Sequence, residues 1–476
     1  MGIKSHHPKY TELLPFWQIA NDSYQGETAI KGRGEIYLPM TSGQIADGAK
    51  NTTSTPTAGA LAYAAYVERS VYPDLYADAV DAAVGIMHRE PPTIDLPESM
   101  KYMLDDCTLL GDSLESLLRK INANQLIDGR LGLLGDIAIK DGKPAAVIVT
   151  YNSHSVINWA DTHADYESGV VKFVVLDESG DEMTDDFAWT TVERYRVLAL
   201  AGPDGEVADE GNYASAVLTS SDDLAGVQLE EPNMGGNRLT KIPFVFVNAK
   251  DLSPNPDQPP LDGLARICLA IYRGEADYRQ SLFMQGQDTL VRIGSMDEDE
   301  QVRTGAGARI DCQIGGDAKY IGVSSTGLPE QRQSLENLYA RAAQKSGQML
   351  NGSDSKESGE ALRIRVSAQT ATLPQLAKTG AAALQQVLRY LAEWQGANPD
   401  EVVVKPNLNF SEADLNGQTL MNIMQAKALG APIAEASIHE WVRDNGLTKL
   451  SYEEELNLIA SEDPMPGASI PSSADE

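Results

Sequence analysis

Two long amphipathic segments with a short strand-rich stretch between them limit the possible folds of this chain more than any other feature. After the proline-rich residues 254–260, apolar side chains recur at helical spacing over residues 261–287. A second helix is predicted over residues 329–350, because proline is favoured in the first turn of a helix. Short strands are predicted between the two helices, at residues 290–293, 308–314 and 320–323. The sequence therefore predicts a helix that leads out, a small β unit, and a helix that returns.

The chain before the proline-rich stretch changes from helical to strand-like periodicity. Helices are predicted at residues 10–17, 61–87 (interrupted by Pro73) and 114–127. From residue 131 the apolar runs are short, and Asp141-Gly142 is typical of a β-hairpin turn. Strands are predicted at residues 131–139, 145–151, 170–176, 190–200, 213–219 and 242–247. Residues 177–231 are so rich in Asp and Glu that much of this sheet is expected to face water. The fold class is α+β, with a sandwich or a sheet flanked by helices.

The C-terminal part is predicted to be mainly helical. A polar loop at residues 351–359 precedes a long helix over residues 360–394, in which Pro374 is expected to cause a kink. A short strand follows at residues 402–404, and further helices at residues 411–460. The last residues are polar and contain proline, which is typical of a disordered tail.

The composition excludes several classes of protein. The formal net charge is −31, with 69 acidic against 38 basic residues, so the chain is not expected to coat nucleic acid by neutralising phosphates. Three widely spaced cysteines predict neither a disulfide framework nor a zinc site, and no metal or other cofactor is expected. No apolar run is long enough for a membrane span, and the first residues lack the apolar stretch of a signal peptide. We therefore expect no membrane partner.

No constellation of residues indicates an enzyme. The chain contains no phosphate-binding G-x-x-x-x-G-K-[ST] sequence, no G-x-S-x-G and no H-E-x-x-H. Adjacent carboxylates point in different directions on a helix or a strand, so they are expected to be solvated charges. The cluster Asp297, Glu298, Asp299 and Glu300 has oxygen ligands that suit a divalent cation, but an exposed loop that keeps the chain soluble is the favoured interpretation.

Several segments resemble tailed-phage portal proteins, in particular the siphophage portal-like family carried as a domain of unknown function. The resemblance lies in the order of the elements and extends, in the same order, over nearly the whole chain. Ser358-Gly359-Glu360-Ala361-Leu362 is similar to the step after the portal tunnel loop, whereas residues 177–231 are not aligned with that family. The segments that carry the resemblance are residues 7–17, 31–39, 63–69, 85–92, 128–136 and 270–278.

The resemblance implies a portal fold and a division of the chain. A helical and β-rich wing is expected over residues 1–260, a stem helix over 261–289, a clip over 290–327, a returning stem helix over 328–350, a tunnel loop over 351–360, a long kinked helix and wing return over 361–410, crown helices over 411–462, and a disordered tail over 463–476.

The resemblance also implies a role at the portal vertex of a virion, assembled in the host cytoplasm. The expected partners are further copies of the chain in a twelve-fold ring, double-stranded DNA passing through the channel without sequence specificity, the terminase, the head–tail adaptor and the major capsid protein. The acidic residues 297–300 would then lie on the clip surface. Leu335, Leu338 and Ala342 are expected to pack the stem, against a neighbouring subunit. The candidates for the channel and tunnel loop are Lys345, Asn351, Ser353, Asp354 and Lys356.

Two alternatives remain open at this point. An acidic virion scaffold or adaptor without a DNA channel would explain the charge equally well. The two long helices would also fit a monomeric bundle. Only a ring requires that the helix pair and the loop after it face a shared axial hole.

Overall fold

The computed structural model shows a mixed helix and sheet chain, which confirms the α+β class. Contacts divide it into two compact units, Met1–Phe410 and Ser411–Glu476. The residues that the structure describes are 2–140, 142–160, 171–183, 186–202, 207–208, 210–219, 229–286, 289–293, 314–321, 326–350, 372–408, 410, 417–432, 434–444, 448 and 450–461.

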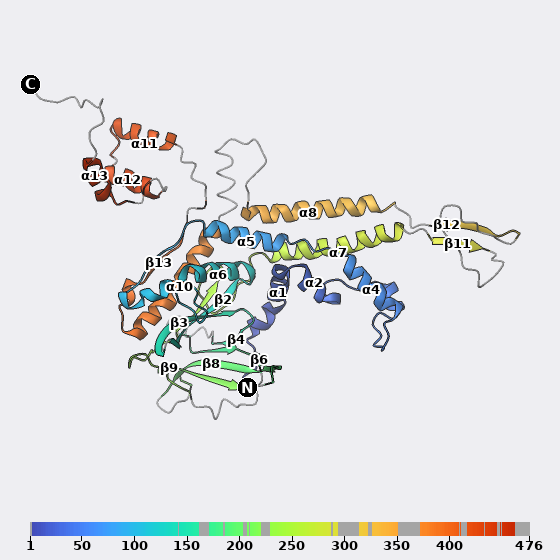
Figure 1. Ribbon diagram of the computed structural model, residues 1–476, viewed down its shortest axis with the longest axis horizontal. Helices are drawn as coiled ribbons and strands as arrows, with labels where there is room; N and C mark the ends of the chain where they lie inside the picture. The colour runs from blue at the N-terminus through green and yellow to red at the C-terminus, as the bar shows by residue number, and fades with distance from the viewer. Residues whose placement is uncertain are drawn as a thin grey trace, which may run out of the picture. The chain divides into compact units, whose positions relative to one another are not determined.

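Two antiparallel sheets form the centre of the first unit (Figure 1). In the three-stranded sheet the order is β10 (Phe244–Asn248), β2 (Arg130–Lys140) and β3 (Lys143–Asn152). In the four-stranded sheet it is β4 (Val156–Trp159), β5 (Phe173–Asp177), β8 (Arg194–Ala201) and β9 (Asn212–Thr219). The smaller pairs are β1 (Thr93–Asp95) with β13 (Val403–Lys405), β6 (Gly180–Met183) with β7 (Trp189–Val192), and β11 (Thr289–Ile293) with β12 (Asp317–Ile321).

Helices cover the sheets and continue beyond them. Those before the sheets are α1 (Pro8–Gln25), α2 (Glu27–Gly32), α3 (Ser42–Ala46), α4 (Ala58–Arg69), α5 (Leu75–Met87) and α6 (Leu114–Ile127), with short 3-10 turns at Gly34–Ile36 and Glu98–Leu104. Those after them are α7 (Asp262–Gln285), α8 (Leu328–Leu350) and α10 (Leu373–Gln395), with a 3-10 turn at Pro399–Glu401. The second unit contains α11 (Gly417–Ala428), α12 (Glu435–Asp444) and α13 (Tyr452–Ser461). None of the helices in the described ranges is both long and apolar enough to cross a membrane.

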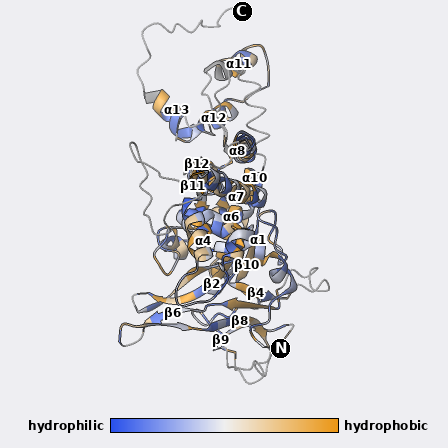
Figure 2. Cartoon of the chain, turned by 90° about the vertical axis from the view of Figure 1, so that its right-hand side faces the viewer, coloured by the Kyte–Doolittle hydropathy of each residue, from blue (hydrophilic) through white to orange (hydrophobic). Residues whose placement is uncertain are grey.

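The two central sheets and α10 share one apolar core. Leu384, Leu388 and Leu391 of α10 are fully buried, and a Cβ added at Gly135 of β2 would lie 2.8 Å from Leu391 Cδ2. Glycine at position 135 therefore allows the helix to approach the sheet closely. In Figure 2 the hydrophobic colour runs along the central strands, in agreement with this core.

Arg130 is a buried cation between the two sheets. Its guanidinium carbon lies 4.0 Å from the ring centroid of Trp159 in β4 and 4.8 Å from that of Phe246 in β10. The side chain is 0% exposed, and none of its nitrogens has a hydrogen-bond partner. Burial lowers the pKa of Arg130 to about 9. The charge is therefore stabilised by the faces of the two aromatic rings.

A buried chain of amides connects the helices to the sheet. Nε2 of His88 lies 2.8 Å from Oδ1 of Asn122, whose Nδ2 donates to Oε1 of Gln125 at 2.9 Å. Nε2 of Gln125 then donates to the backbone oxygen of Asn248 at 2.8 Å. These contacts join α5, α6 and β10 through polar groups that would be costly to bury unpaired.

Most predicted elements are confirmed, and the exceptions have local causes. Strands β2 and β3 form the predicted hairpin, in which Lys140 is opposite Lys143 and Gly142 has φ 74°. The single strand expected over residues 190–200 is divided, because β7 pairs with β6 whereas β8 joins the four-stranded sheet. The expectation that this sheet mostly faces water is wrong for β8, whose residues 197–201 are all buried.

One proline has a different role from the one expected. Pro374 lies in the first turn of α10 and causes no kink within it, since a first-turn proline loses no intrahelical hydrogen bond. Pro15 lies inside α1. Pro73 separates α4 from α5, as predicted. The part of the predicted long helix over residues 360–371 and the strand expected at 308–313 lie outside the described residues.

Asp128 is a buried carboxylate at the C-terminal end of α6. Its side chain accepts hydrogen bonds from Nδ2 of Asn21 and, at 2.7 Å, from Oγ of Ser153. Burial raises the pKa of Asp128 to about 6, although these hydrogen bonds favour the charged form. The position of Asp128 also disfavours its charged form, because the free carbonyl groups at the C-terminal end of a helix repel negative charge.

We predict that Asp128→Asn makes the protein more stable at pH 7 and less dependent on pH. The folded pKa lies above the unfolded value of about 3.9, so folding favours the protonated acid. The contribution of the Asp128 carboxyl to the free energy of unfolding is complete below about pH 4. It falls by about 3 kcal/mol in total as the pH rises through 6. Urea unfolding at a series of pH values measures the difference between the two proteins.

Asp251→Asn is the matched control, because the pKa of Asp251 is shifted in the opposite direction from that of Asp128. Partial burial disfavours the charge, but hydrogen bonds from Ser253 and Asn248 lower the pKa of Asp251 overall. Its contribution is present above the unfolded pKa and is lost in acid, so this substitution is expected to reduce stability at pH 7. An Asp128→Asn protein no more stable than the wild type at pH 7 would contradict the account.

Candidate functional site

The helix pair α7 and α8 is the most distinctive part of the first unit. The two helices lie side by side and run in opposite directions, and the strands β11 and β12 pair in the segment between them (Figure 1). The predicted order of outgoing helix, small β unit and returning helix is thus confirmed for the described residues. Pro329 lies in the first turn of α8, as predicted.

Helix α7 is fixed to the rest of the unit along its first half. Leu264, Ile267, Cys268 and Ile271, the apolar stripe of the sequence, are all buried. Further along, Nε of Arg273 donates to the backbone oxygen of Tyr37 at 2.8 Å. Helix α7 contacts α1, α4 and α5, and Tyr66 of α4 reaches Asp277 in its second half, so α7 has a fixed direction when it leaves the core.

Helix α8 is held on α7 by a close apolar contact. A Cβ added at Gly274 of α7 would lie 2.9 Å from Cδ2 of Leu335, so the missing side chain leaves the space that Leu335 occupies. Leu335 is 6% exposed and Ala342 is 0% exposed, while Leu338 is partly buried against the same cluster. The three predicted stem-packing residues therefore pack within one chain, Leu335 against α7 and all three in one apolar cluster. Their burial does not require a neighbouring subunit.

Polar contacts along the pair explain the segment 270–278 that the sequence marked. The hydroxyl of Tyr339 donates to Oε1 of Glu275 at 3.3 Å, and Glu275 also pairs with Arg279 at 2.8 Å. The hydroxyl of Tyr66 in α4 donates to Oδ1 of Asp277 at 2.5 Å. Burial, followed by the hydrogen bond to Glu275, raises the pKa of Tyr339 to about 12. The partners of Glu275 and Asp277, in α8 and α4, could not be identified from the sequence because they are distant along the chain.

The exposed surface of α8 is polar and carries slightly more positive than negative charge. The exposed acids of this helix are Glu330 and Glu336, and the exposed bases are Arg332, Arg341 and Lys345. Nε of Arg332 pairs with Oε1 of Glu336 at 2.9 Å, one turn along the helix. The predicted channel residue Lys345 is exposed, and its Nζ lies over Gly263 at the start of α7. This surface is unusual in a chain with a net charge of −31.

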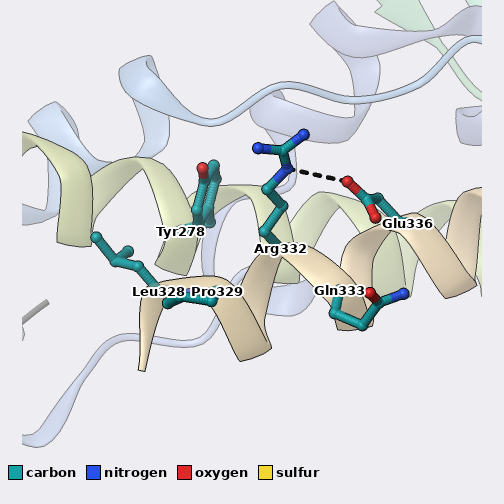
Figure 3. Close-up of a pocket in the computed structure, with 6 residues that line it drawn as sticks. All are labelled: Tyr278, Leu328, Pro329, Arg332, Gln333 and Glu336. Atoms are coloured by element: carbon teal, nitrogen blue, oxygen red, sulfur yellow. Dashed lines mark hydrogen bonds and ion pairs between the residues drawn. The ribbon is translucent and has the colours of Figure 1, made fainter. Parts of the chain in front are cut away.

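An open groove lies where α8 begins. Tyr278 comes from α7, and Leu328, Pro329, Arg332, Gln333 and Glu336 come from the first turns of α8 (Figure 3). Its volume is about 540 Å³. It combines an aromatic ring with an ion pair, and no group of three metal-ligating side chains occurs among the residues that are described.

The remaining predicted site residues lie outside the described residues. These are the tunnel-loop candidates Asn351, Ser353, Asp354 and Lys356, and the acidic clip residues Asp297, Glu298, Asp299 and Glu300. Their roles stay predictions. The same holds for the predicted boundaries between wing, stem, clip, tunnel loop and crown.

The helix pair and α10 coincide with a known sequence family. A family model described as a domain of unknown function (DUF4055) matches residues 260–395, which extend from just before α7 to the last residue of α10. This confirms, for that part of the chain, the resemblance drawn from the sequence. No curated protein shows significant similarity to this sequence.

Two solved structures that match this chain come from the necks of GTA particles. A chain from the neck of a native GTA particle, computed with C12 symmetry, has a TM-score of 0.37 and 12% identity, with 77% of this chain and 89% of that chain covered. A chain from the neck of an empty GTA particle, computed with C6 symmetry, has a TM-score of 0.36 and 13% identity, with 76% and 88% covered. We assign no residue role from these two structures.

We predict that Leu335→Ala reduces the free energy of unfolding by about 2–5 kcal/mol, because it opens a cavity between α7 and α8. Gln333→Ala, on the exposed face of the same helix, should change it by less than about 0.5 kcal/mol. Urea unfolding over a dilution series measures both. A loss for Leu335→Ala that disappears on dilution would mean that this residue packs against another subunit instead.

Proposed function

We propose that this chain is the portal subunit of a tailed phage or phage-like particle. In this role, many copies form a ring whose axial hole admits DNA during packaging and releases it during ejection. The observation that carries the proposal is the α7–β11–β12–α8 arrangement, a rigid helix pair that leads to and from a small β unit. The family match over the same residues supports it.

The charge of the helix pair is compatible with a channel for DNA. A wall that binds phosphates tightly would slow the duplex, whereas an acidic chain with a few exposed cations would hold it only weakly. Arg341 and Lys345 are two such exposed cations of α8. The terminase and the head–tail adaptor would then dock in turn on the clip, and the major capsid protein would surround the ring.

A second candidate is an acidic scaffold or adaptor of the virion without a channel. The internal packing of Leu335 and Ala342 favours neither candidate, because it needs no other subunit. An enzymatic role is not part of either proposal.

We predict that the purified full-length chain forms closed rings with a central hole, with twelve copies the expected number. Negative-stain top views show the hole, and native mass spectrometry gives the copy number. A protein that stays monomeric over the whole accessible concentration range, or that forms solid or open assemblies, would falsify the portal proposal and favour the scaffold.

We also predict that Lys345→Glu weakens the binding of a short DNA duplex to the ring. The loss of one cation per subunit should make binding less dependent on salt between about 50 and 200 mM, because fewer counterions are released. Fluorescence anisotropy of a labelled duplex measures this. Lys120→Glu in α6 is the matched control, since Lys120 is also exposed but lies far from α8 in the sequence. Equal effects of the two substitutions would exclude a specific role for Lys345.

A further inference from the structure

The hairpin of β6 and β7 exposes three large apolar side chains. Met183 is 58% exposed, Phe187 82% and Trp189 69%. Met183 and Trp189 are directly opposite in the antiparallel register, so their side chains leave the same face of the ribbon. Phe187 follows in the turn with φ 59°, a backbone conformation that bulky residues rarely adopt.

Polar contacts hold this hairpin in place. Oγ1 of Thr191 donates to Oδ1 of Asp181 at 2.6 Å, and Arg194 pairs with Glu182 at 2.5 Å. At the base, Glu178 pairs with Arg196 at 2.7 Å. An isolated two-stranded hairpin is only marginally stable in water, so these contacts keep an apolar tip extended that could otherwise collapse.

The surroundings of the tip restrict what can cover it. Residues 177–194 contain seven acidic residues and one basic residue. Lys4 and Arg196 pair with Glu193 and Glu178 from outside this segment, so the acids still outnumber the bases after these pairs are counted. This density of negative charge repels nucleic acid and anionic lipid surfaces. Exposed aromatic residues and methionine are enriched in protein–protein interfaces, where they fill apolar pockets. The complementary surface is an apolar pocket with lysine and arginine at its edge.

A second copy of this chain is a poor match for that description. The chain carries 69 acidic against 38 basic residues, so contact between the acidic hairpin and another copy brings like charges together. A different protein with a basic rim avoids this repulsion.

We propose that the β6–β7 hairpin is a docking element for a different protein of the same particle, which receives Met183, Phe187 and Trp189 in an apolar pocket edged by Lys and Arg. The inference rests on the proposed function only because it places the partner in the virion. The hairpin surface is separate from the helix pair and does not depend on a channel.

The experiment uses intact particles that carry a photoreactive residue in the full chain. Phe187→p-benzoylphenylalanine is irradiated and the cross-linked peptides are identified by mass spectrometry. Leu61→p-benzoylphenylalanine is the matched control, since Leu61 is 60% exposed on α4. We expect cross-links from position 187 to a different virion protein, at a peptide with neighbouring Lys or Arg residues. Adding Asp186→Lys should reduce the yield about tenfold, because it removes part of the charge complementarity.

Other outcomes would overturn the proposal. These are cross-links to another copy of the chain, cross-links to DNA, a yield no higher than that of the Leu61 control, or a yield that Asp186→Lys leaves unchanged. Phe187→Ser with Trp189→Ser should leave the oligomeric mass of the purified chain unchanged, and a change in mass would identify a second copy as the occupant. A chain that forms no ring but still cross-links to a different particle protein would contradict the portal proposal and support the docking element.

Discussion

The contact of Leu335 with Gly274 is the interaction on which the helix pair depends. Without a side chain at position 274, α8 can approach α7 closely enough for Leu335 to be buried. Since α7 is itself enclosed by α1, α4 and α5, the contact extends the rigidity of the core to α8. A β unit carried between two helices can serve as a docking point only if both helices keep their direction.

Buried polar groups join the layers of the first unit. Arg130 lies between two aromatic rings from different sheets, and the chain from His88 to Asn248 ties α5 and α6 to β10. Asp128 is destabilising when charged, but its hydrogen bonds connect α1, α6 and the turn after β3. Such groups fix one relative position of the layers, because any other position would leave them unpaired.

The helix α8 and the β6–β7 hairpin expose different combinations of charge and apolar surface. The exposed surface of α8 has few charges of mixed sign, whereas the β6–β7 hairpin combines a dense negative charge with exposed aromatic rings. The first arrangement suits a surface over which a polyanion slides. The second suits a specific contact with a basic partner.

The sequence by itself determined the local elements and their order, because periodicity and the positions of Pro and Gly report on the nearest residues. It predicted α7, α8 and the β2–β3 hairpin in this way, and the segment 270–278 was recognised as a motif. Only the tertiary structure decided what those elements touch. It showed that Leu335 packs on its own chain, that residues 190–200 are divided between two sheets, that Pro374 begins a helix, and that Arg130 lies between two rings. The packing of Leu335, the division of residues 190–200 and the position of Arg130 depend on partners that are distant along the chain. Local patterns of residues carry no information about distant partners.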